Sequence, residues 1–392
     1  MCNKILIFLF FLSLIILFIL PCVTAQQIEN GTLEEPYQIK NIEDLINVQN
    51  NLYAHYILMY DLDGAELSDW TPIGTINSFG GTFNGNNKTI SNISISSSDY
   101  RITHLGLFGA MNKDGRIINL TIENITIRIE GKQDGKYVGP IVGYNLGYIE
   151  NCHSRNVIIE LENGKVGGIA GVNYGIITNC SSAGDLKASE VGGIVGSNIE
   201  GLISNSYSNA TIISQGIAGG IVGTNFKGNL QNCYSDNILN SSEIAGGIVG
   251  GNYDGGKIQY CYSLSSMTGN NLIAGGISGT NQGYIENCIS LNEYIHGAKY
   301  LNLSNFPYSI ELNRRVSIGF ICGKTDYDKI PLNCYSSNQI VTNKFFHQGE
   351  NGHLLRNEAI FDAFPNFVWE GWDTQVWLLH DTSNTPILVW QK

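Results

Sequence analysis

A short glycine-framed segment recurs along the chain and limits its fold more than any other feature. Variants of "GGIVG" end at Gly143, Gly171, Gly196, Gly223, Gly250 and Gly279, and looser copies end at Gly109 and Gly323. The six regular copies are 28, 25, 27, 27 and 29 residues apart. A period near 27 residues over this many copies is typical of a solenoid, in which each repeat contacts only its neighbours.

The residue types within each repeat favour strands over helices. The segments are short, rich in Ile, Val, Ser and Thr, and interrupted by Gly and Asn, whereas helical repeats need long amphipathic stretches. A repeat of this length suits three short strands and three turns. We therefore predict an all-β, right-handed parallel β-helix, in which equivalent residues of successive turns stack about 4.8 Å apart.

Four positions of the repeat carry the same residue in nearly every copy, and these columns fix the register. Isoleucine fills the first column: Ile141, Ile169, Ile194, Ile221, Ile248, Ile277 and Ile321. Asparagine fills the second: Asn145, Asn173, Asn198, Asn225, Asn252 and Asn281. The third holds cysteine with one serine: Cys152, Cys180, Ser206, Cys233, Cys261, Cys288 and Cys334. Serine fills the fourth, two residues later: Ser154, Ser182, Ser208, Ser235, Ser263, Ser290 and Ser336.

Stacking gives these columns a physical reason. One turn cannot bury its own apolar face, so the isoleucines are predicted to form a dry internal column along the stack. The column asparagines tolerate the left-handed conformation at a turn, and their stacked amides can hydrogen-bond along the axis. Glycine allows the chain to turn or approach closely without a Cβ clash.

Alternation along the strands predicts which side chains face outward. In residues 180–188, every second residue from Cys180 is small or apolar and is predicted to face inward, and Asn179 interrupts the pattern at a corner. The valines next to the column isoleucines are predicted to form a partly apolar outer strip. These valines are Val142, Val195, Val222 and Val249.

The first 25 residues have the pattern of a secretory signal. Lys4 precedes an uninterrupted apolar run at residues 5–20, and Val23 and Ala25 fit the small-residue cleavage rule. An uncleaved anchor helix is the alternative, because the apolar run is nearly long enough to span a bilayer. Nothing later in the sequence is apolar enough to span a membrane, so we predict an exported chain without membrane insertion after signal cleavage.

The predicted organisation has four parts. A signal peptide at residues 1–25 precedes an N-terminal cap with the first rungs at 26–105, the regular repeats at 106–342, and a C-terminal cap at 343–392. A loop excursion at 294–316 interrupts the repeats, where the spacing between Gly279 and Gly323 widens to 44 residues.

Both ends of the stack need a cover, because a bare end exposes unpaired strand edges. At the N-terminus, Asn41 with Asp44 three residues later predicts a capped short helix over the first rung. Its apolar residues are Ile42, Leu45, Ile46 and Leu52. At the C-terminus, four aromatic residues predict a plug on the last rung: Phe367, Trp369, Trp372 and Trp377.

The charge of the chain argues against two classes of partner. Its formal net charge is −12 and only 14% of its residues are charged, without any basic run. Nucleic acid and anionic lipid are therefore not predicted partners. We predict no cofactor, and no metal site, because close Cys or His pairs of zinc-ligand spacing are missing from the sequence.

Nine cysteines raise the question of disulfides. Cys2 and Cys22 fall in the signal segment, and Cys322 lies outside the cysteine column. The six column cysteines are predicted to be buried free thiols that serine can replace, as Ser206 does. One or two bridges are the alternative, because export permits disulfides and neighbouring rungs are within bridging range.

Three tyrosines are the best binding residues that the repeats offer. Tyr207, Tyr234 and Tyr262 fall at one position of successive rungs, and alternation predicts that they point outward. An exposed aromatic stripe can stack against sugar rings, whereas ordinary cross-strand stacking is the plainer interpretation. The competing site is the excursion, where Lys299, Arg314 and Arg315 favour an acidic ligand.

The repeat segments resemble the GLUG-motif repeat. The stretch "GTLEEPYQIKNIEDLINVQNN", followed by "WTPIGT" and "FGGTFNGNNKTISNISI", is similar to the usual entry into such repeats, and "FVWEGWDTQVW" to their usual ending. The resemblance covers roughly residues 31–390. It implies exported or surface β-helical proteins that are often adhesin-like, and modules of some secreted proteases. No His-Glu-x-x-His motif is present, so protease activity is not carried over to this chain.

These observations predict an exported, non-catalytic β-helical protein that serves adhesion or scaffolding at a surface, through protein or glycan contacts. The alternative is a carbohydrate-active β-helical enzyme, either a polysaccharide lyase or a glycoside hydrolase. No acidic residue recurs across rungs, as clustered carboxylates for calcium or acid–base work would require. Nine Asn-x-Ser/Thr sites make the chain a candidate glycoprotein.

Overall fold

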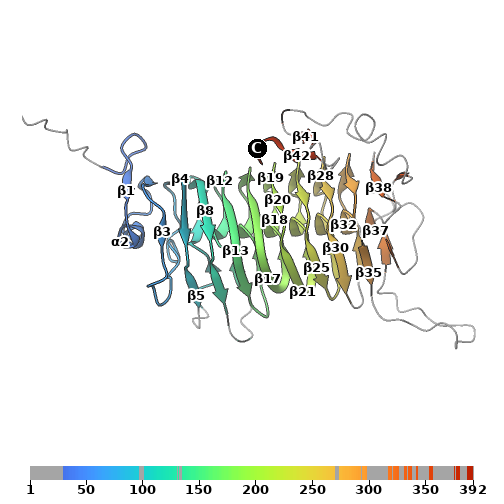
Figure 1. Cartoon of the computed structure of the whole chain (residues 1–392), viewed down its shortest axis with the longest axis horizontal. Coiled ribbons are helices and arrows are strands. Elements are labelled where there is room, and N and C mark those ends of the chain that lie inside the picture. Colours follow the sequence, from blue (N-terminus) through green and yellow to red (C-terminus); the bar gives the residue numbers. More distant parts are fainter. Residues whose placement is uncertain are drawn as a thin grey trace, which may run out of the picture.

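The computed structural model describes most of the chain from residue 30 on. The described residues are 30–96, 101–129, 131, 135–269, 273–292, 294–297, 317–319, 321–325, 331–332, 334–337, 341–342, 353–355, 375, 377–379 and 386–391. They form a long parallel β-helix in which sequence order follows the axis, from α2 at one end to β37 and β38 at the other (Figure 1). The all-β solenoid prediction is confirmed, whereas the predicted signal at residues 1–25 lies outside the described residues.

One parallel sheet holds a single strand from each of eight turns. Its strands follow one another along the axis: β7 (Phe108–Met111), β11 (Val142–Asn145), β15 (Ala170–Asn173), β18 (Val195–Ile199), β22 (Val222–Phe226), β27 (Val249–Tyr253), β32 (Ser278–Asn281) and β37 (Cys322–Thr325). Each strand comes from a glycine-framed segment, so the repeated sequence forms this sheet.

A second sheet of 32 strands forms the rest of the wall. Its first strands are β1 (Tyr37–Ile39), β2 (Tyr56–Leu58), β3 (Leu62–Asp63), β4 (Thr82–Ser91), β5 (Ser94–Ser96), β6 (His104–Leu105), β8 (Arg116–Glu123), β9 (Thr126–Arg128), β10 (Tyr137–Val138), β12 (Tyr148–Glu150), β13 (His153–Glu160), β14 (Lys165–Gly167), β16 (Ile176–Thr178) and β17 (Ser181–Gly192). The middle strands are β19 (Leu202–Ser204), β20 (Tyr207–Ser208), β21 (Thr211–Gly219), β23 (Asn229–Gln231), β24 (Tyr234–Ser235), β25 (Ile238–Ser241), β26 (Ile244–Gly246), β28 (Lys257–Gln259), β29 (Tyr262–Ser263), β30 (Ser266–Gly269) and β31 (Ile273–Gly275). The last are β33 (Tyr284–Glu286), β34 (Ile289–Ser290), β35 (Tyr294–Gly297), β36 (Ser317–Gly319), β38 (Tyr335–Ser337), β39 (Val341–Thr342) and β40 (His353–Leu355).

A regular turn contains more strands than the three predicted. The turn that begins with β22 continues through β23, β24, β25 and β26 before the next copy of the motif starts. Lys227 and Asn232 separate the first three of these strands, and both have left-handed backbone angles (φ 54° and 55°). Each left-handed residue bends the chain, so the wall is divided into shorter strands.

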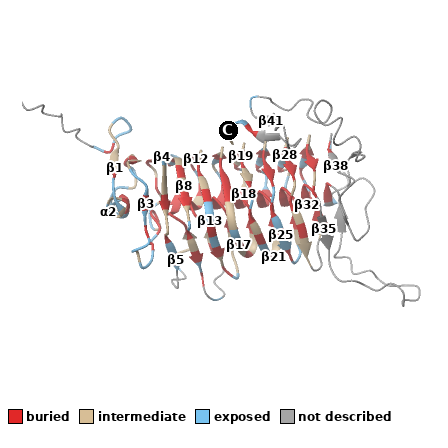
Figure 2. Ribbon diagram, in the orientation of Figure 1, coloured by how far each residue is buried: buried red, intermediate tan, exposed pale blue. Residues whose placement is uncertain are grey.

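The isoleucine column fills the interior as predicted. All seven of its residues are fully buried, and buried residues run along the stack inside both sheets (Figure 2). The backbone connects the column directly: Ile194 N–H donates to Ile221 O at 2.9 Å, and Ile221 N–H donates to Ile248 O at 2.8 Å. Burial of apolar side chains between successive turns is the main source of stability in such a stack.

The asparagine column forms a chain of buried amides along the axis. Asn198 Nδ2 donates to Asn225 Oδ1, and Asn225 Nδ2 donates to Asn252 Oδ1, both at 2.9 Å. The predicted amide ladder is confirmed, but these residues are not the left-handed ones. Left-handed angles occur instead at the corner that was placed at Asn179: Asn119, Asn151, Asn179, Asn205, Asn232, Tyr260 and Asn287.

The cysteine column consists of free, buried thiols in the structure. Each thiol donates to the carbonyl two residues earlier, as Cys233 Sγ does to Gln231 O at 3.3 Å. Ser206 makes the equivalent bond to Ser204 O at 2.7 Å. Serine replaces cysteine at this position because a hydroxyl is a donor of similar size for the same carbonyl.

The predicted outer valine strip is wrong. Val142, Val195, Val222 and Val249 are all fully buried. The chain turns sharply before each valine, at Gly139–Pro140 before Val142 and at a glycine pair before the other three, so the alternation of the preceding strand does not continue through the turn. The glycine after the valine packs against the previous turn: a Cβ on Gly196 would lie 2.7 Å from Gly171 O and 2.8 Å from Val166 N.

The N-terminal cap is confirmed with one exception. Helix α2 (Ile42–Ile46) begins after Asn41, whose Oδ1 accepts from Asp44 N at 2.9 Å, and η1 (Asn47–Asn50) follows. Leu45 is fully buried, but Ile46 is 45% exposed because the helix has only one inward side. The helix lies at the first-rung end of the stack (Figure 1).

The described part of the C-terminal end differs from the predicted aromatic plug on the last rung. Trp377 lies in β41 (Trp377–Leu379), which pairs antiparallel with β42 (Pro386–Leu388), and η3 (Val389–Gln391) follows. The other three predicted plug residues, Phe367, Trp369 and Trp372, lie outside the described residues. Of the predicted excursion, residues 294–297 are strand β35, and residues 298–316, with Lys299, Arg314 and Arg315, are not described.

Candidate functional site

The three predicted tyrosines stack on one another. Tyr207 in β20, Tyr234 in β24 and Tyr262 in β29 are partners in register, and we call them the tyrosine ladder. Their ring centroids are 5.0 and 4.9 Å apart, with interplanar angles of 4° and 1°. Rings that are parallel at this distance face one another along the axis. The flat platform of outward ring faces that a sugar would stack on is therefore not formed.

The tyrosine ladder is one part of a longer column. Ser181 and His153 precede it in register, and Ile289 follows it. His153 Nδ1 and Ser181 Oγ are 2.9 Å apart, and burial, with a smaller effect of Arg155, lowers the pKa of His153 to about 4. This outer column changes its residue type from rung to rung, unlike the inner columns.

The expected exposure of the ladder is wrong for two of its three residues. Tyr234 is 9% exposed and Tyr262 is 1% exposed, whereas Tyr207 is half-buried. Gln391 Nε2 in η3 donates to the Tyr234 hydroxyl at 2.6 Å, so the C-terminal segment reaches the ladder. Burial raises the pKa of both Tyr234 and Tyr262. Alternation predicts the side of a strand on which a residue lies, but not what covers that side.

A second outer column was missed by the sequence analysis. The residue directly after each column asparagine is apolar in five successive turns, and we call these residues the outer stripe: Leu146, Tyr174, Ile199, Phe226 and Tyr253. The register of Ile199, Phe226 and Tyr253 follows the eight-strand sheet. The sequence contains the pattern that would have predicted this column, because each of the five residues directly follows an asparagine of the most regular column of the repeat.

The outer stripe is open to solvent. Leu146, Tyr174 and Phe226 are 38%, 39% and 44% exposed. The rings of Phe226 and Tyr253 are 5.3 Å apart and tilted by 38°, so they are not stacked face to face as in the tyrosine ladder. Phe226 is exposed and Tyr253 is half-buried, so the Phe226 ring is the more accessible of the two.

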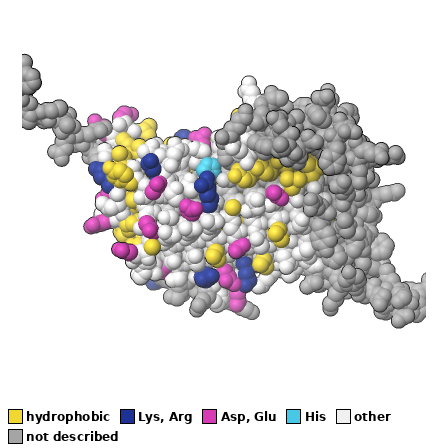
Figure 3. Space-filling model, in the orientation of Figure 1, with side chains coloured by type: hydrophobic (Ala, Val, Ile, Leu, Met, Phe, Trp, Pro, Cys, Tyr) yellow, Lys and Arg dark blue, Asp and Glu magenta, His cyan; other side chains and the backbone are white. Residues whose placement is uncertain are grey.

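Charged residues directly follow three members of the outer stripe, and the first of them is the exposed Glu200 after Ile199. Lys227 and Asp254 directly follow Phe226 and Tyr253, and they form an exposed ion pair at 3.2 Å. In the described part of the face shown in Figure 3, Lys and Arg side chains are interspersed with Asp and Glu side chains. The three charged residues that follow members of the outer stripe likewise include both signs, so they form no block of one charge.

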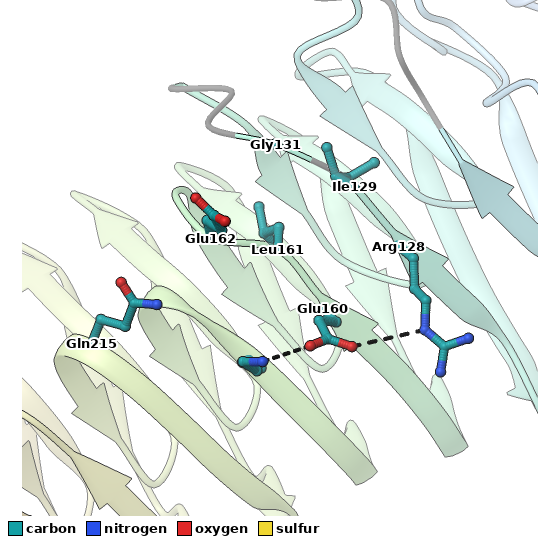
Figure 4. Close-up of a pocket in the computed structure, with 8 residues that line it drawn as sticks. Arg128, Ile129, Gly131, Glu160, Leu161, Glu162 and Gln215 are labelled. Carbon is teal, nitrogen blue, oxygen red and sulfur yellow. Dashed lines mark hydrogen bonds and ion pairs between the residues drawn. The ribbon is translucent and has the colours of Figure 1, made fainter.

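A shallow hollow of about 430 Å³ lies elsewhere on the outer wall (Figure 4). Its lining residues are Arg128, Ile129, Gly131, Glu160, Leu161, Glu162, Lys187 and Gln215. Glu160 Oε1 is 2.5 Å from Lys187 Nζ, and Glu160 Oε2 is 3.8 Å from Arg128 Nε. The hydrogen bond from Lys187 lowers the pKa of Glu160, with a further contribution from its charge. A carboxylate held ionised in this way is a poor general acid.

Two further features of the described residues bear on chemistry and location. Within them, no group of three His, Cys, Asp or Glu side chains is placed to hold a metal ion. None of the helices in the same ranges has the length and apolar character needed to cross a bilayer.

Comparisons with known proteins match the repeat region. The GLUG motif matches residues 162–187, which include strands β14 and β15. Halomucin of Haloquadratum walsbyi is 37% identical over 142 residues, or 33% of this chain. A protein of Evansella cellulosilytica with the provisional name of Gly-rich membrane protein is 36% identical over 129 residues, or 31% of this chain. The matches span only 2% and 14% of these two relatives.

The same fold occurs in a solved structure. A protein of Bacteroides ovatus, provisionally named an immunoglobulin A1 protease, superposes with a TM-score of 0.52 and 21% identity. The superposition covers 93% of this chain and 95% of that one. At this identity the likeness shows the fold alone. The motif match and the two relatives confirm the GLUG-motif resemblance that the sequence predicted.

Proposed function

We propose that this parallel β-helix with a GLUG motif is an exported, non-catalytic protein. It serves adhesion or scaffolding at a surface by binding neutral glycan chains along its outer stripe. The observation that carries this proposal is the apolar and aromatic column on five successive turns, of which three members are exposed, with Tyr174 and Phe226 both about two-fifths exposed. Aromatic side chains combine an apolar face with a fixed geometry, which suits the C–H faces of sugar rings.

The rigid stack makes this column suitable for a polymer. Five turns extend about 19 Å along the axis at the spacing of parallel strands. Tyr174 and Phe226 are two turns apart, or about 10 Å, which is comparable with the length of a disaccharide. The backbone holds these positions before any ligand arrives, so little ordering is needed on binding.

Export and surface location rest on the N-terminal sequence and on one relative. The signal-like segment at residues 1–25 favours secretion, and one relative is named as a membrane protein. The acidic net charge of the chain argues against nucleic acid as a partner.

The test measures how well two double variants of exposed residues are retained on a glycan array. Replacing Tyr174 and Phe226 together by Ser should weaken glycan retention at least tenfold, because each aromatic contact contributes about 1 kcal/mol. The matched control replaces Ile213 and Ile238, which are 42% and 63% exposed on β21 and β25, and should leave retention unchanged. If both double variants lost glycan retention equally, the outer stripe would not be the binding site. If the wild-type chain bound immobilised surface proteins but no glycan, the ligand would not be a glycan.

A carbohydrate-active enzyme is the second candidate, and the hollow with Glu160 and Glu162 is the observation that favours it. The ion pair of Glu160 with Lys187 leaves Glu162 as the better candidate acid. The assay is release of reducing ends from neutral and acidic polysaccharides. If the chain releases reducing ends, and Glu162→Gln abolishes this activity while Phe226→Ser keeps it, the function is catalysis rather than adhesion.

A further inference from the structure

From Tyr207 onward, the outer column that contains the tyrosine ladder becomes more buried with each turn toward the C-terminus. Tyr207 is half-buried, Tyr234 is 9% exposed, Tyr262 is 1% exposed, and Ile289 is fully buried. A small side chain such as Ser181 can be buried by its neighbours in the column, but a large side chain on the outer side of the wall needs another segment over it. The segment that the structure describes there is the C-terminal one, because Gln391 Nε2 bonds the Tyr234 hydroxyl from 157 residues away.

The C-terminal segment is attached to the stack differently from every turn of the helix. Strands β41 and β42 form a two-stranded antiparallel sheet of their own, whereas the turns are joined by continuous parallel pairing. A two-stranded hairpin is only marginally stable by itself in water. The side-chain contact between Gln391 and Tyr234 therefore attaches this segment to the wall, and Leu388 in the same segment is fully buried.

The ladder does not need the C-terminal segment in order to form. Backbone bonds from the previous turn hold each tyrosine: Tyr234 N–H donates to Ser206 O and Tyr262 N–H donates to Cys233 O, both at 3.1 Å. The rings then stack at the spacing of the rungs, with Tyr234 presenting its hydroxyl to the Gln391 amide. The result is a preformed strip of apolar ring edges and a phenolic acceptor, which matches a peptide that carries an apolar side chain and a carboxamide.

We propose that the tyrosine ladder is a docking strip for an extended peptide segment, and that the resident occupant is the C-terminal segment of the same chain, held by Leu388 and Gln391. This goes beyond glycan binding at the outer stripe, because the two columns occupy different positions of each turn and the ladder takes a polypeptide. A partner protein with a similar segment would compete with the resident one for the same strip.

Tyrosine nitration followed by mass spectrometry tests the proposal on the full-length chain. In the native protein Tyr234 and Tyr262 should resist nitration, while Tyr53 and Tyr60, at 66% and 61% exposed, react freely. Gln391→Ala should raise the nitration rate of Tyr234 and Tyr262 about fivefold, which corresponds to the loss of one hydrogen bond of ordinary net strength. Gln215→Ala, an exposed glutamine at the hollow, is the matched control and should change nothing.

The decisive step adds a peptide to the variant. The heptapeptide PILVWQK, which reproduces residues 386–392, should restore protection of Tyr234 and Tyr262 in the Gln391→Ala chain, and PILVWAK should not. Tyr56, which is 6% exposed near the N-terminus, should stay protected throughout and shows that the stack is folded.

Two outcomes would overturn the proposal. Unchanged protection of the ladder in both Gln391→Ala and a second variant, Leu388→Asp, would mean that this segment does not hold the strip closed. Increased nitration that PILVWQK fails to reverse would mean that the segment covers the ladder without the ladder being a peptide site.

Discussion

The inner and outer columns of this β-helix follow different rules, although both arise from the same repeat. Inside, isoleucine recurs at seven positions and asparagine at six with few exceptions. Outside, the column of the tyrosine ladder passes through Ser181, Tyr207 and Ile289 within a few turns, and the outer stripe varies as widely. An inner side chain packs against, or hydrogen-bonds with, the equivalent residue of each neighbouring turn. A substitution in one turn therefore disturbs that turn and the two turns beside it. An outer side chain contacts solvent or a separate segment and is free to differ.

The largest expected effect compares two isoleucines on either side of the wall. Ile221 is fully buried in the inner column, whereas Ile213 is 42% exposed on β21. Ile221→Asp should unfold or split the stack, because an unpaired buried charge costs several kcal/mol. Ile213→Asp should change the free energy of unfolding by less than about 0.5 kcal/mol. Urea denaturation followed by circular dichroism measures both, and similar midpoints for the two variants would refute the inner assignment of Ile221.

The second prediction concerns the amide ladder. Asn225 accepts from Asn198, donates to Asn252 and also donates to Gly228 O. Asn225→Ala leaves several buried polar groups without this partner and should destabilise the chain by about 3 kcal/mol. Asn229→Ala, at an exposed position four residues later, should have almost no effect. If both substitutions cost the same, the buried ladder adds no stability beyond that of an exposed asparagine.

The third prediction uses pH on the outer column. Burial lowers the pKa of His153 to about 4, below the value near 6.5 of an unfolded chain. As pH falls from 6.5 toward 4, the unfolded chain binds a proton that the folded chain does not, so stability decreases with falling pH. Allowing for partial exposure, the loss should be about 1.5 kcal/mol between pH 6.5 and 4.5.

The control for this pH effect is His153→Ser, which places the residue of the next turn, Ser181, at this position. The variant should lose most of the pH dependence and retain a smaller slope from His104, whose pKa burial also lowers. Stability curves of wild type and variant that stay parallel between pH 6.5 and 4.5 would show that His153 is not the group responsible.

The contrast between the columns also explains how much could be predicted from sequence. The inner isoleucine, asparagine and cysteine columns were predicted correctly, because repetition at a fixed period directly reports the stacking of equivalent residues. The valines were assigned to the wrong side, because alternation does not continue through the turn that precedes each of them. The burial of Tyr234 was missed because its hydroxyl is bonded by a segment more than a hundred residues away, which has no period in common with the ladder.

The smallest expected effect tests whether the cysteine column is set by hydrogen bonding or by packing. Cys233 is fully buried, and burial raises the pKa of its thiol, so it should react with a thiol reagent only after unfolding. Cys233→Ser should cost less than about 1 kcal/mol, because a serine hydroxyl can donate to Gln231 O as Ser206 does to Ser204 O. Cys233→Val has similar bulk but lacks a donor, and should cost more than the serine variant, about 1.5 kcal/mol, because Gln231 O loses one of its two donors and keeps the bond from Asn205 N–H. Thermal unfolding of the two variants gives the order, and a valine variant that is more stable than the serine variant would show that packing alone determines the column.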